Sequence, residues 1–493
     1  MNDTNWQAFF PEIFLLIASC VIAVVDLFVT HPRRLPTYLL TQVSLAIVAI
    51  LHLVMFQQGD TTYAAQGLVV SDALGHLLGF FASVAIMVTL AYSRSYAAPR
   101  ELLKGELFSL SLFSLLGTLV MLSANNFLTI YLGLELMSLS LYALSALRRD
   151  HGPSTEAAMK YFVLGSLASG FMLYGLSMMY GATGSLELSE VFKAIATGTL
   201  NSQVMVFGIV FLVAGLAFKL GAAPFHMWAP DVYQGTPTAV TLLIAGAPKL
   251  SAFAITLRLL VEGMLGVAAE WQQMLVVLAV CSMGIGNIVA IAQSNLKRML
   301  AYSSIAQMGF MLLGLCCGVV DNNAAPAVNA YSSAMFYVVT YVLTTLGTFG
   351  LIMLMSRAGF EAEELSDLRG LAKRSPWFAG MMALFMLSLA GLPPTVGFYA
   401  KLSVLQALVT TNDGGFIWLA VVAVLLSVIG AYYYLRAIKL MYFDEPADTA
   451  PLESSGEAKA ILSLNGLAVL VFGLLPGGLM TLCAQAIVKA LAT

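Results

Sequence analysis

Apolar runs long enough to cross a membrane recur along the whole chain. A hydrocarbon core of about 30 Å is crossed by about 20 helical residues, and runs of that length follow one another through the sequence. Hydrophobic residues make up 60% of the chain and charged residues 10%, whereas soluble proteins carry about 25% charged residues. The sequence therefore predicts an all-α integral membrane protein with about fourteen transmembrane helices, and it leaves no stretch for a soluble catalytic domain.

The expected helices are separated by short polar segments. The fourth and the fifth are divided only by Ala124, Asn125 and Asn126. The predicted spans are 11–30, 38–56, 74–92, 106–124, 126–147, 157–180, 203–231, 238–261, 272–293, 299–318, 328–355, 376–411, 417–442 and 458–482.

Lysine and arginine are distributed unequally between the two sets of alternate loops. Positive residues stay on the cytoplasmic side of a membrane, so the richer set marks that side. The poorer set holds only Lys193, Arg258 and Lys489. With an even number of helices, this distribution predicts that both termini are periplasmic. The richer set consists of Arg33, Arg34, Arg94, Arg100, Lys104, Arg148, Arg149, Lys297, Arg298, Arg357, Arg369, Lys373, Arg374, Arg436, Lys439 and Lys459.

Four ionisable residues interrupt the apolar runs near their middles: Glu135, Lys219, Lys249 and Lys401. A charge at the centre of a spanning helix costs about 2.5 to 3.5 kcal/mol on insertion scales, so such residues commonly mark ion or proton pathways. Burial favours the neutral form of a lysine, and a carboxylate that approaches restores the charged form. We therefore expect a proton relay in which Glu135 sets the proton affinity of Lys219. The alternative is a set of structural ion pairs, but three lysines face one obvious mid-membrane carboxylate.

Two further residues are weaker candidates for the relay. His226 follows a predicted helix break and could relay protons between Lys219 and Lys249, or it could simply form hydrogen bonds at the end of a half-helix. Lys160 lies near the cytoplasmic end of the sixth span, four residues after Glu156. Proton uptake from the cytoplasm and a surface pair at i,i+4 explain Lys160 about equally well.

The seventh and twelfth spans contain helix breakers beside their lysines. Pro224 follows Lys219, and Pro393 and Pro394 precede Lys401. Proline removes a backbone donor, and the carbonyls it frees are tolerated at membrane depth only where they face protein or a wet cavity. Because the two breaks are five spans apart, we expect two five-helix units of inverted topology, as in many secondary transporters. The predicted division is 1–105, 106–262, 271–442 and 443–493; two unrelated proline kinks are the alternative.

Five motifs around these residues resemble the antiporter-like subunits of NADH-quinone oxidoreductase (respiratory complex I), and among them the subunit N group. The resemblance covers essentially the whole chain. A lysine at position 401 separates the chain from the similar subunit M, which has a glutamate there, and the chain lacks the long lateral helix of subunit L. The motifs are YLGLELMSLSLYAL around Glu135, FKLGAAPFHMWAPDVYQGTPTAVT from residue 218, APKLSAF around Lys249, NLKRMLAYSSIAQMG at 295–309 and GLPPTVGFYAKLSVL around Lys401.

The resemblance implies one proton channel, coupled to quinone reduction elsewhere in the complex. The length of the chain and the absence of a transit peptide favour a bacterial inner membrane, with an organelle-encoded homologue as the alternative. The resemblance places the family's functional carboxylate at Glu135, its lysines at Lys219 and Lys249 and its exit residue at Lys401, with Lys160 and His226 at polar positions of the central axis. Subunits K and M are the expected neighbours. NADH, FMN, iron–sulfur clusters and quinone are implied in partner subunits, with no cofactor or metal on this chain.

Other function classes remain as alternatives. The nearest is a subunit of a multisubunit cation/proton antiporter or of a membrane-bound hydrogenase, which share this architecture. A free-standing solute/proton symporter and a purely structural assembly subunit are more distant. The five cysteines lack metal-ligand spacing, and a net charge of -3 gives no indication of a nucleic-acid partner. The lipid bilayer is the expected environment.

Overall fold

The computed structural model describes residues 5–198, 200–319, 326–411, 415–446, 452 and 456–491. In this part of the chain the only sheet is a hairpin of β1 (Thr62–Ala64) and β2 (Val69–Ser71). Shorter helical turns are η1 (Trp6–Phe9), η2 (Ala98–Arg100), the π-helical η3 (Arg258–Glu262), η4 (Leu265–Val267) and η5 (Leu365–Leu368). The α-helices are α1 (Phe10–Asp26), α2 (Leu35–Gln58), α3 (Ala73–Ala97), α4 (Gly105–Leu122), α5 (Phe127–Ser145), α6 (Gly152–Thr183), α7 (Leu188–Ala196), α8 (Ser202–Leu220), α9 (Trp228–Gly235), α10 (Thr238–Ala245), α11 (Ala247–Leu257), α12 (Ala268–Ile291), α13 (Leu296–Cys316), α14 (Ala327–Met355), α15 (Leu371–Arg374), α16 (Pro376–Ala390), α17 (Val396–Thr410), α18 (Ile417–Phe443), α19 (Gly456–Leu474) and α20 (Gly477–Leu491).

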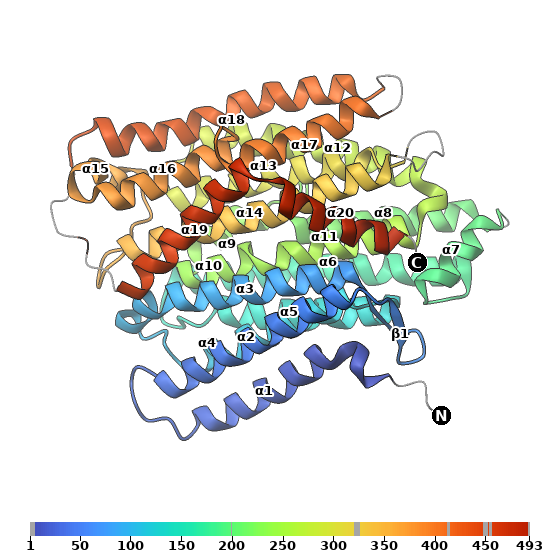
Figure 1. Ribbon diagram of the computed structural model, residues 1–493, viewed down its shortest axis with the longest axis horizontal. Helices are drawn as coiled ribbons and strands as arrows, with labels where there is room; N and C mark the ends of the chain where they lie inside the picture. Colours follow the sequence, from blue (N-terminus) through green and yellow to red (C-terminus); the bar gives the residue numbers. More distant parts are fainter. Residues whose placement is uncertain are drawn as a thin grey trace.

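The long helices lie side by side in one bundle, with α1 at one edge and α18 at the other (Figure 1). Thirteen of the described helices are long and apolar enough to cross a membrane. Each corresponds to a predicted span. The remaining predicted span, 376–411, is the pair α16 and α17, each of which is too short to cross alone. The prediction of an all-α membrane protein is confirmed.

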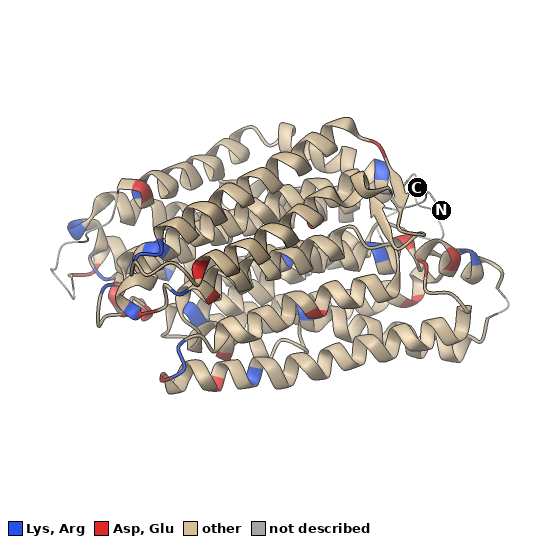
Figure 2. Ribbon diagram, turned by 90° about the horizontal axis from the view of Figure 1, so that it is seen from below, with Lys and Arg blue, Asp and Glu red and all other residues tan. Residues whose placement is uncertain are grey.

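Charged residues gather at the two ends of the bundle (Figure 2). The loops that carry the richer set of Lys and Arg meet at one end, where Arg100 Nε lies 2.6 Å from Glu361 Oε1 and Lys297 Nζ lies 2.7 Å from Glu363 Oε1. We call this the basic end. The hairpin, α7 and the end of α20 lie at the opposite end (Figure 1). The loops that are rich in Lys and Arg therefore lie at one end of the bundle, as the unequal distribution of positive charge predicts.

Both predicted breaks are present, and each begins at a glycine. The helix α8 ends at Leu220, and Gly221 follows with φ +74° before α9 begins. The helix α16 ends at Ala390, and Gly391 follows with φ +81° before α17 begins. Such positive φ angles carry no steric cost for glycine. The proline three residues after each glycine, Pro224 or Pro394, prevents the helix from resuming at once.

Contacts repeat at matching positions in the two halves of the chain. The Asn that precedes α5, Asn126, forms a β-bridge with Glu187, and the Asn that precedes α13, Asn295, forms one with Glu364. The flanking backbone hydrogen bonds match as well: Phe127 N to Leu186 O (2.9 Å) and Leu188 N to Asn125 O (3.1 Å) in the first half, and Leu296 N to Glu363 O (2.5 Å) and Leu365 N to Ser294 O (2.8 Å) in the second.

Close helix packing follows the same register. Gly117 of α4 lies against the backbone of α5 at Gly133 and Met137. Gly286 of α12 lies against the backbone of α13 at Tyr302 and Ala306. Glycine at such a crossing lets two helix backbones approach closely. The helix pairs α4–α5 and α12–α13 therefore pack in the same way.

Four features were absent from the prediction. The hairpin β1–β2 and the short helix α7 lie in connections where only loops were expected. The eighth span is interrupted at Gly246, between α10 and α11. The last span, predicted to end at residue 482, instead breaks between α19 and α20, and α20 continues to Leu491, where Lys489 Nζ donates to Gly59 O over 2.9 Å.

Candidate functional site

Lys219 lies at the last turn of α8, immediately before the first break. Its ammonium donates to the hydroxyl of Ser138 on α5 over 2.9 Å and to that of Ser169 on α6 over 3.4 Å. The sequence pattern cannot reveal these partners because they come from two other helices. Both hydroxyls are neutral and can accept or donate, so Lys219 is bound in a way that suits either protonation state.

Glu135 lies one helical turn before Ser138 on α5, so the two side chains share a helix face. Among the described residues, the buried Oε1 atom of Glu135 has no hydrogen-bond partner. Ser138 therefore links the Lys219 ammonium to the helix face that carries Glu135, and no ion pair within 4.0 Å joins Glu135 to Lys219.

Lys249 is 2% exposed and lies on α11, just after the interruption at Gly246. Its ammonium donates over 2.7 Å to the carbonyl of Leu220 and lies 3.5 Å from the carbonyl of Lys219. These carbonyls are free because α8 stops there and no following turn supplies their N–H donors. The end of α8 thus carries Lys219 and, through its free backbone carbonyls, also binds the ammonium of Lys249.

Lys401 has an equivalent place at the second break. It is 8% exposed, and its ammonium donates to the carbonyl of Ala390, the last residue of α16, over 2.9 Å. A second hydrogen bond of 2.9 Å reaches the hydroxyl of Ser427 on α18. The ring of Phe310 lies 4.9 Å from its Nζ atom. A lysine ammonium therefore binds freed carbonyls at each break.

None of these three lysines has a carboxylate within 4.0 Å among the residues that the structure describes. Arg258 offers the contrast, since it is 1% exposed and donates to both carboxylate oxygens of Asp72 over 2.9 Å and to Glu262 over 3.1 Å. Asp72 and Arg258 form a buried ion pair that fixes the opposite end of the bundle. The ammonium groups of Lys219, Lys249 and Lys401 instead donate to neutral carbonyl and hydroxyl oxygens. Their contacts therefore differ from those of the structural ion pair at Arg258.

His226 lies within the first break, between α8 and α9. Its ring centroid is 6.4 Å from that of Tyr302 on α13, and no hydrogen bond from its buried Nδ1 atom is found in the described part of the chain. Its described contacts do not join it to Lys219 or Lys249, whereas the Lys249 ammonium lies 3.5 Å from the backbone carbonyl of Lys219. A role for His226 between them remains a prediction.

Lys160 lies on α6 at the basic end, where its ammonium pairs with Glu156 over 2.7 Å and with Asp231 over 2.8 Å. The other oxygen of Asp231 pairs with Arg298 over 2.7 Å. These groups line an open cavity of about 470 Å³ that also receives His151. Partial burial, and secondarily Arg148, lowers the pKa of His151. The cavity is a polar vestibule at the basic end, and it leads toward α9 of the first break.

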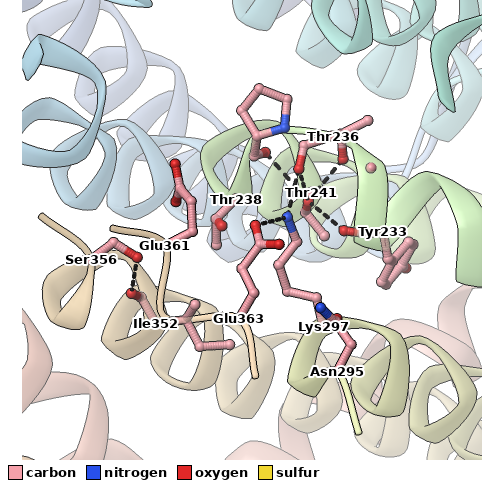
Figure 3. A network of polar contacts seen from close by, with 12 residues as sticks. Tyr233, Thr236, Thr238, Thr241, Asn295, Lys297, Ile352, Ser356, Glu361 and Glu363 are labelled. Atoms are coloured by element: carbon pink, nitrogen blue, oxygen red, sulfur yellow. Dashed lines mark hydrogen bonds and ion pairs between the residues drawn. The ribbon is translucent and has the colours of Figure 1, made fainter. Parts of the chain in front are cut away.

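The sequence pattern missed Lys297, which it placed among the loop residues. Lys297 is fully buried, and it donates to the carbonyl of Thr236 over 2.6 Å and to Glu363 over 2.7 Å (Figure 3). Thr236 ends α9, so Lys297 ties the junction of α9 and α10 to α13 and to the loop before η5. It acts as a structural anchor beside the vestibule.

The pattern also missed a cluster of neutral polar groups between the two breaks. Gln307 of α13 donates to the carbonyl of Leu389 over 2.9 Å and to the hydroxyl of Tyr434 over 3.0 Å, and it accepts from the hydroxyl of Tyr337. Ser303 contacts Tyr434 over 2.5 Å. Leu389 precedes Ala390, so Gln307 and Lys401 bind consecutive carbonyls at the end of α16. Residues of this type are common in cores, and the sequence alone does not distinguish them.

Sequence comparison gives close relatives over the full length. The family described as "NADH:quinone oxidoreductase/Mrp antiporter, TM" matches residues 124–430. The NADH-quinone oxidoreductase subunit N of Herminiimonas arsenicoxydans is 60% identical over 497 residues, which cover 100% of both chains. That of Polaromonas naphthalenivorans (strain CJ2) is 59% identical over 490 residues, which cover 99% of this chain and 98% of the relative.

Solved structures with the same fold include respiratory and antiporter complexes. A chain of respiratory complex I from Thermus thermophilus with bound aureothin aligns with a TM-score of 0.81 and 31% identity, covering 97% of this chain and 100% of that chain. A chain of the Mrp complex from Dietzia sp. DQ12-45-1b aligns with a TM-score of 0.83 and 20% identity, covering 99% of this chain and 97% of that chain. The second likeness concerns the fold alone.

Proposed function

This chain belongs to the subunit N family of NADH-quinone oxidoreductases, and we propose that protons cross it along a line from Glu135 through Lys219 and Lys249 to Lys401. It is a proton-translocating membrane subunit of a translocase complex. The observation that carries the proposed route is the position of the lysines at the freed carbonyls of two broken helices, without carboxylate partners.

The first transfer is the best defined. The Lys249 ammonium lies 3.5 Å from the backbone carbonyl of Lys219, and serine hydroxyls accept hydrogen bonds from the Lys219 ammonium. A negative charge on Glu135 favours a proton on Lys219, and a change of that charge releases it. Lys249 then accepts the proton while Leu220 O remains its hydrogen-bond partner. Quinone chemistry in partner subunits causes this change in the charge of Glu135.

The second transfer crosses from Lys249 to Lys401. The Gln307 cluster lies on this route because Gln307 and Lys401 bind adjacent carbonyls. No described hydrogen bond joins Lys249 to the cluster, so water molecules complete this part of the route. Lys401 and Ser427 then pass the proton toward the periplasm. The vestibule with Lys160 and Asp231 supplies protons from the cytoplasm, with the basic end facing the cytoplasm by the distribution of charge.

Partner subunits provide the rest of the enzyme. Other complex I subunits are partners of this chain; we assign K and M as its direct neighbours. NADH, FMN, iron–sulfur clusters and quinone belong to partner subunits. The chain is a multi-pass protein of a bacterial respiratory membrane, and we place both termini in the periplasm. The two matching sets of contacts support inverted five-helix units at 106–262 and 271–442.

The alternative, a subunit of a cation/proton antiporter or a membrane-bound hydrogenase, is supported at the level of fold alone. The Mrp chain is only 20% identical, whereas subunit N relatives reach 60% identity over the full length. The comparison therefore favours NADH-quinone oxidoreductase.

Substitution of Lys249 and Lys401 tests the route. We expect Lys249→Ala and Lys401→Ala each to lower the rate of NADH-driven proton uptake into inverted membrane vesicles by on the order of tenfold or more, with the complex assembled. Lys193→Ala, at an exposed pair with Glu190 outside the bundle, is the control. Proton uptake at the control rate in both lysine variants would contradict the route.

A further inference from the structure

A second cavity at the basic end lies between the loop before α2, the end of α3 and the start of α19. Its volume is about 390 Å³, and Arg33, Arg94, Ser95 and Glu457 supply its polar lining. It is separate from the vestibule, with which it shares no lining residue. Because three membrane helices begin or end here, the cavity lies at the depth of lipid headgroups.

The cavity carries more positive charge than its own carboxylate balances. Arg94 Nη1 reaches Glu457 Oε2 at 3.4 Å, and its guanidinium lies 4.8 Å from the centre of the Tyr38 ring. The hydroxyl of Tyr38 also donates to Glu457, over 3.0 Å. No described residue pairs with the Arg33 guanidinium. Its neighbour Arg34, by comparison, forms a 2.8 Å pair with Asp26.

An apolar stripe leads from this cavity along α3 into the membrane region. Ala91 lines the cavity, and Val88 and Val84, three and seven residues earlier, are partly exposed. Residues at this spacing share one face of a helix. The cavity therefore joins a site for a negatively charged headgroup to a surface on which an acyl chain can lie.

We propose that this cavity binds an anionic glycerophospholipid. Its phosphate lies between the guanidinium groups of Arg33 and Arg94, which match phosphate geometry, and the Ser95 hydroxyl donates a further hydrogen bond. An acyl chain follows Ala91, Val88 and Val84. Basic pockets between membrane helices at the cytoplasmic side suit anionic headgroups. The site is independent of the proton route.

A photoreactive benzophenone amino acid in place of the exposed Ala98 tests the proposal. The whole complex is reconstituted in vesicles of phosphatidylethanolamine with a minority of phosphatidylglycerol, irradiated, and the lipid attached to this chain is identified by mass spectrometry. We expect phosphatidylglycerol to be enriched over its share in the vesicle. Arg33→Gln should lower that enrichment about fivefold, which corresponds to about 1 kcal/mol per arginine.

The matched control is Arg149→Gln, which removes an exposed arginine of the same end that does not line the cavity; it should leave the enrichment unchanged. The Arg33 guanidinium has no partner among the described residues, and its backbone N–H, which donates to His31 Nδ1 over 3.1 Å, is kept in the variant. Its side chain can therefore be replaced without disturbing the fold, and Arg33→Gln with Arg94→Gln should abolish the enrichment. Attached lipid that mirrors the vesicle composition in every variant would overturn the proposal. Displacement of the lipid by inorganic phosphate would overturn it too, because the site would then bind free phosphate.

Discussion

At the scale of the residue, the sequence identified the ionisable groups but not their acceptors. Glu135, Lys219, Lys249 and Lys401 stand out because a charge in an apolar run is costly. Their partners are backbone carbonyls and serine hydroxyls, which carry no sequence signal of their own. Which carbonyl is free depends on where a helix breaks and on which helix packs beside it.

The hydroxyl partners of Lys219 give a prediction at this scale. We expect Ser138→Ala with Ser169→Ala to lower coupled turnover by about three- to tenfold, since a hydrogen bond to a charged group contributes about 1.5 to 3 kcal/mol and water replaces part of it. The measurement is NADH oxidation and proton uptake by the same vesicles. Ser177→Ala is the matched control, because the exposed Ser177 hydroxyl donates to Leu173 O of its own helix over 2.8 Å and lies away from Lys219. Full turnover in the double variant would show that these hydroxyls are dispensable.

At the scale of the element, proline and glycine positions predicted both helix breaks, while the shorter elements escaped prediction. The pairs Gly221–Pro224 and Gly391–Pro394 have the same spacing, but Lys219 precedes its proline and Lys401 follows its own, which obscures the correspondence. The strands β1 and β2 have three residues each, too few for a periodic pattern to emerge.

The two break glycines give a differential prediction. Both have positive φ, so alanine costs about 1 to 2 kcal/mol at either. A Cβ at Gly391 would lie 2.6 Å from Lys401 Cδ, whereas one at Gly221 would lie 3.5 Å from Lys249 Nζ, an ordinary contact. We therefore expect Gly391→Ala to displace its lysine and to lower proton uptake several-fold more than Gly221→Ala. Equal losses, measured at equal abundance of the complex, would contradict this account.

At the scale of the whole molecule, hydropathy predicted about fourteen spans, and thirteen described helices are long and apolar enough to cross a membrane. Loop charge predicted which loops lie at the basic end. The correspondence between the two five-helix units was predicted only from the positions of the two helix breaks. In the structure it extends to the Asn126 and Asn295 bridges and to the glycine crossings at Gly117 and Gly286. The sequence conceals these matches because a helix crossing requires a small residue at one point and leaves most of its neighbours free to vary.

The glycine crossings predict matched effects on assembly. A Cβ at Gly117 or Gly286 would overlap the backbone of the facing helix, so we expect either alanine variant to destabilise the fold by about 1 to 3 kcal/mol or more. Gly170 has open space around its Cβ position, and Gly170→Ala should leave abundance unchanged. Complex abundance in membranes on native gels measures all three. Normal abundance of both Gly117→Ala and Gly286→Ala would contradict this prediction, because it would show that the two helices of each pair can move apart without loss of stability.

The most direct test of the whole account is Lys219→Ala in intact cells, followed by two assays on membranes with normally assembled complex. The assays measure NADH-to-quinone electron transfer and the proton gradient that it drives. The account predicts that both fall together, by on the order of tenfold or more, because Lys219 is the group that couples the Glu135 charge to Lys249. Unchanged electron transfer and an unchanged gradient would contradict the relay and would leave Lys219 as a structural residue.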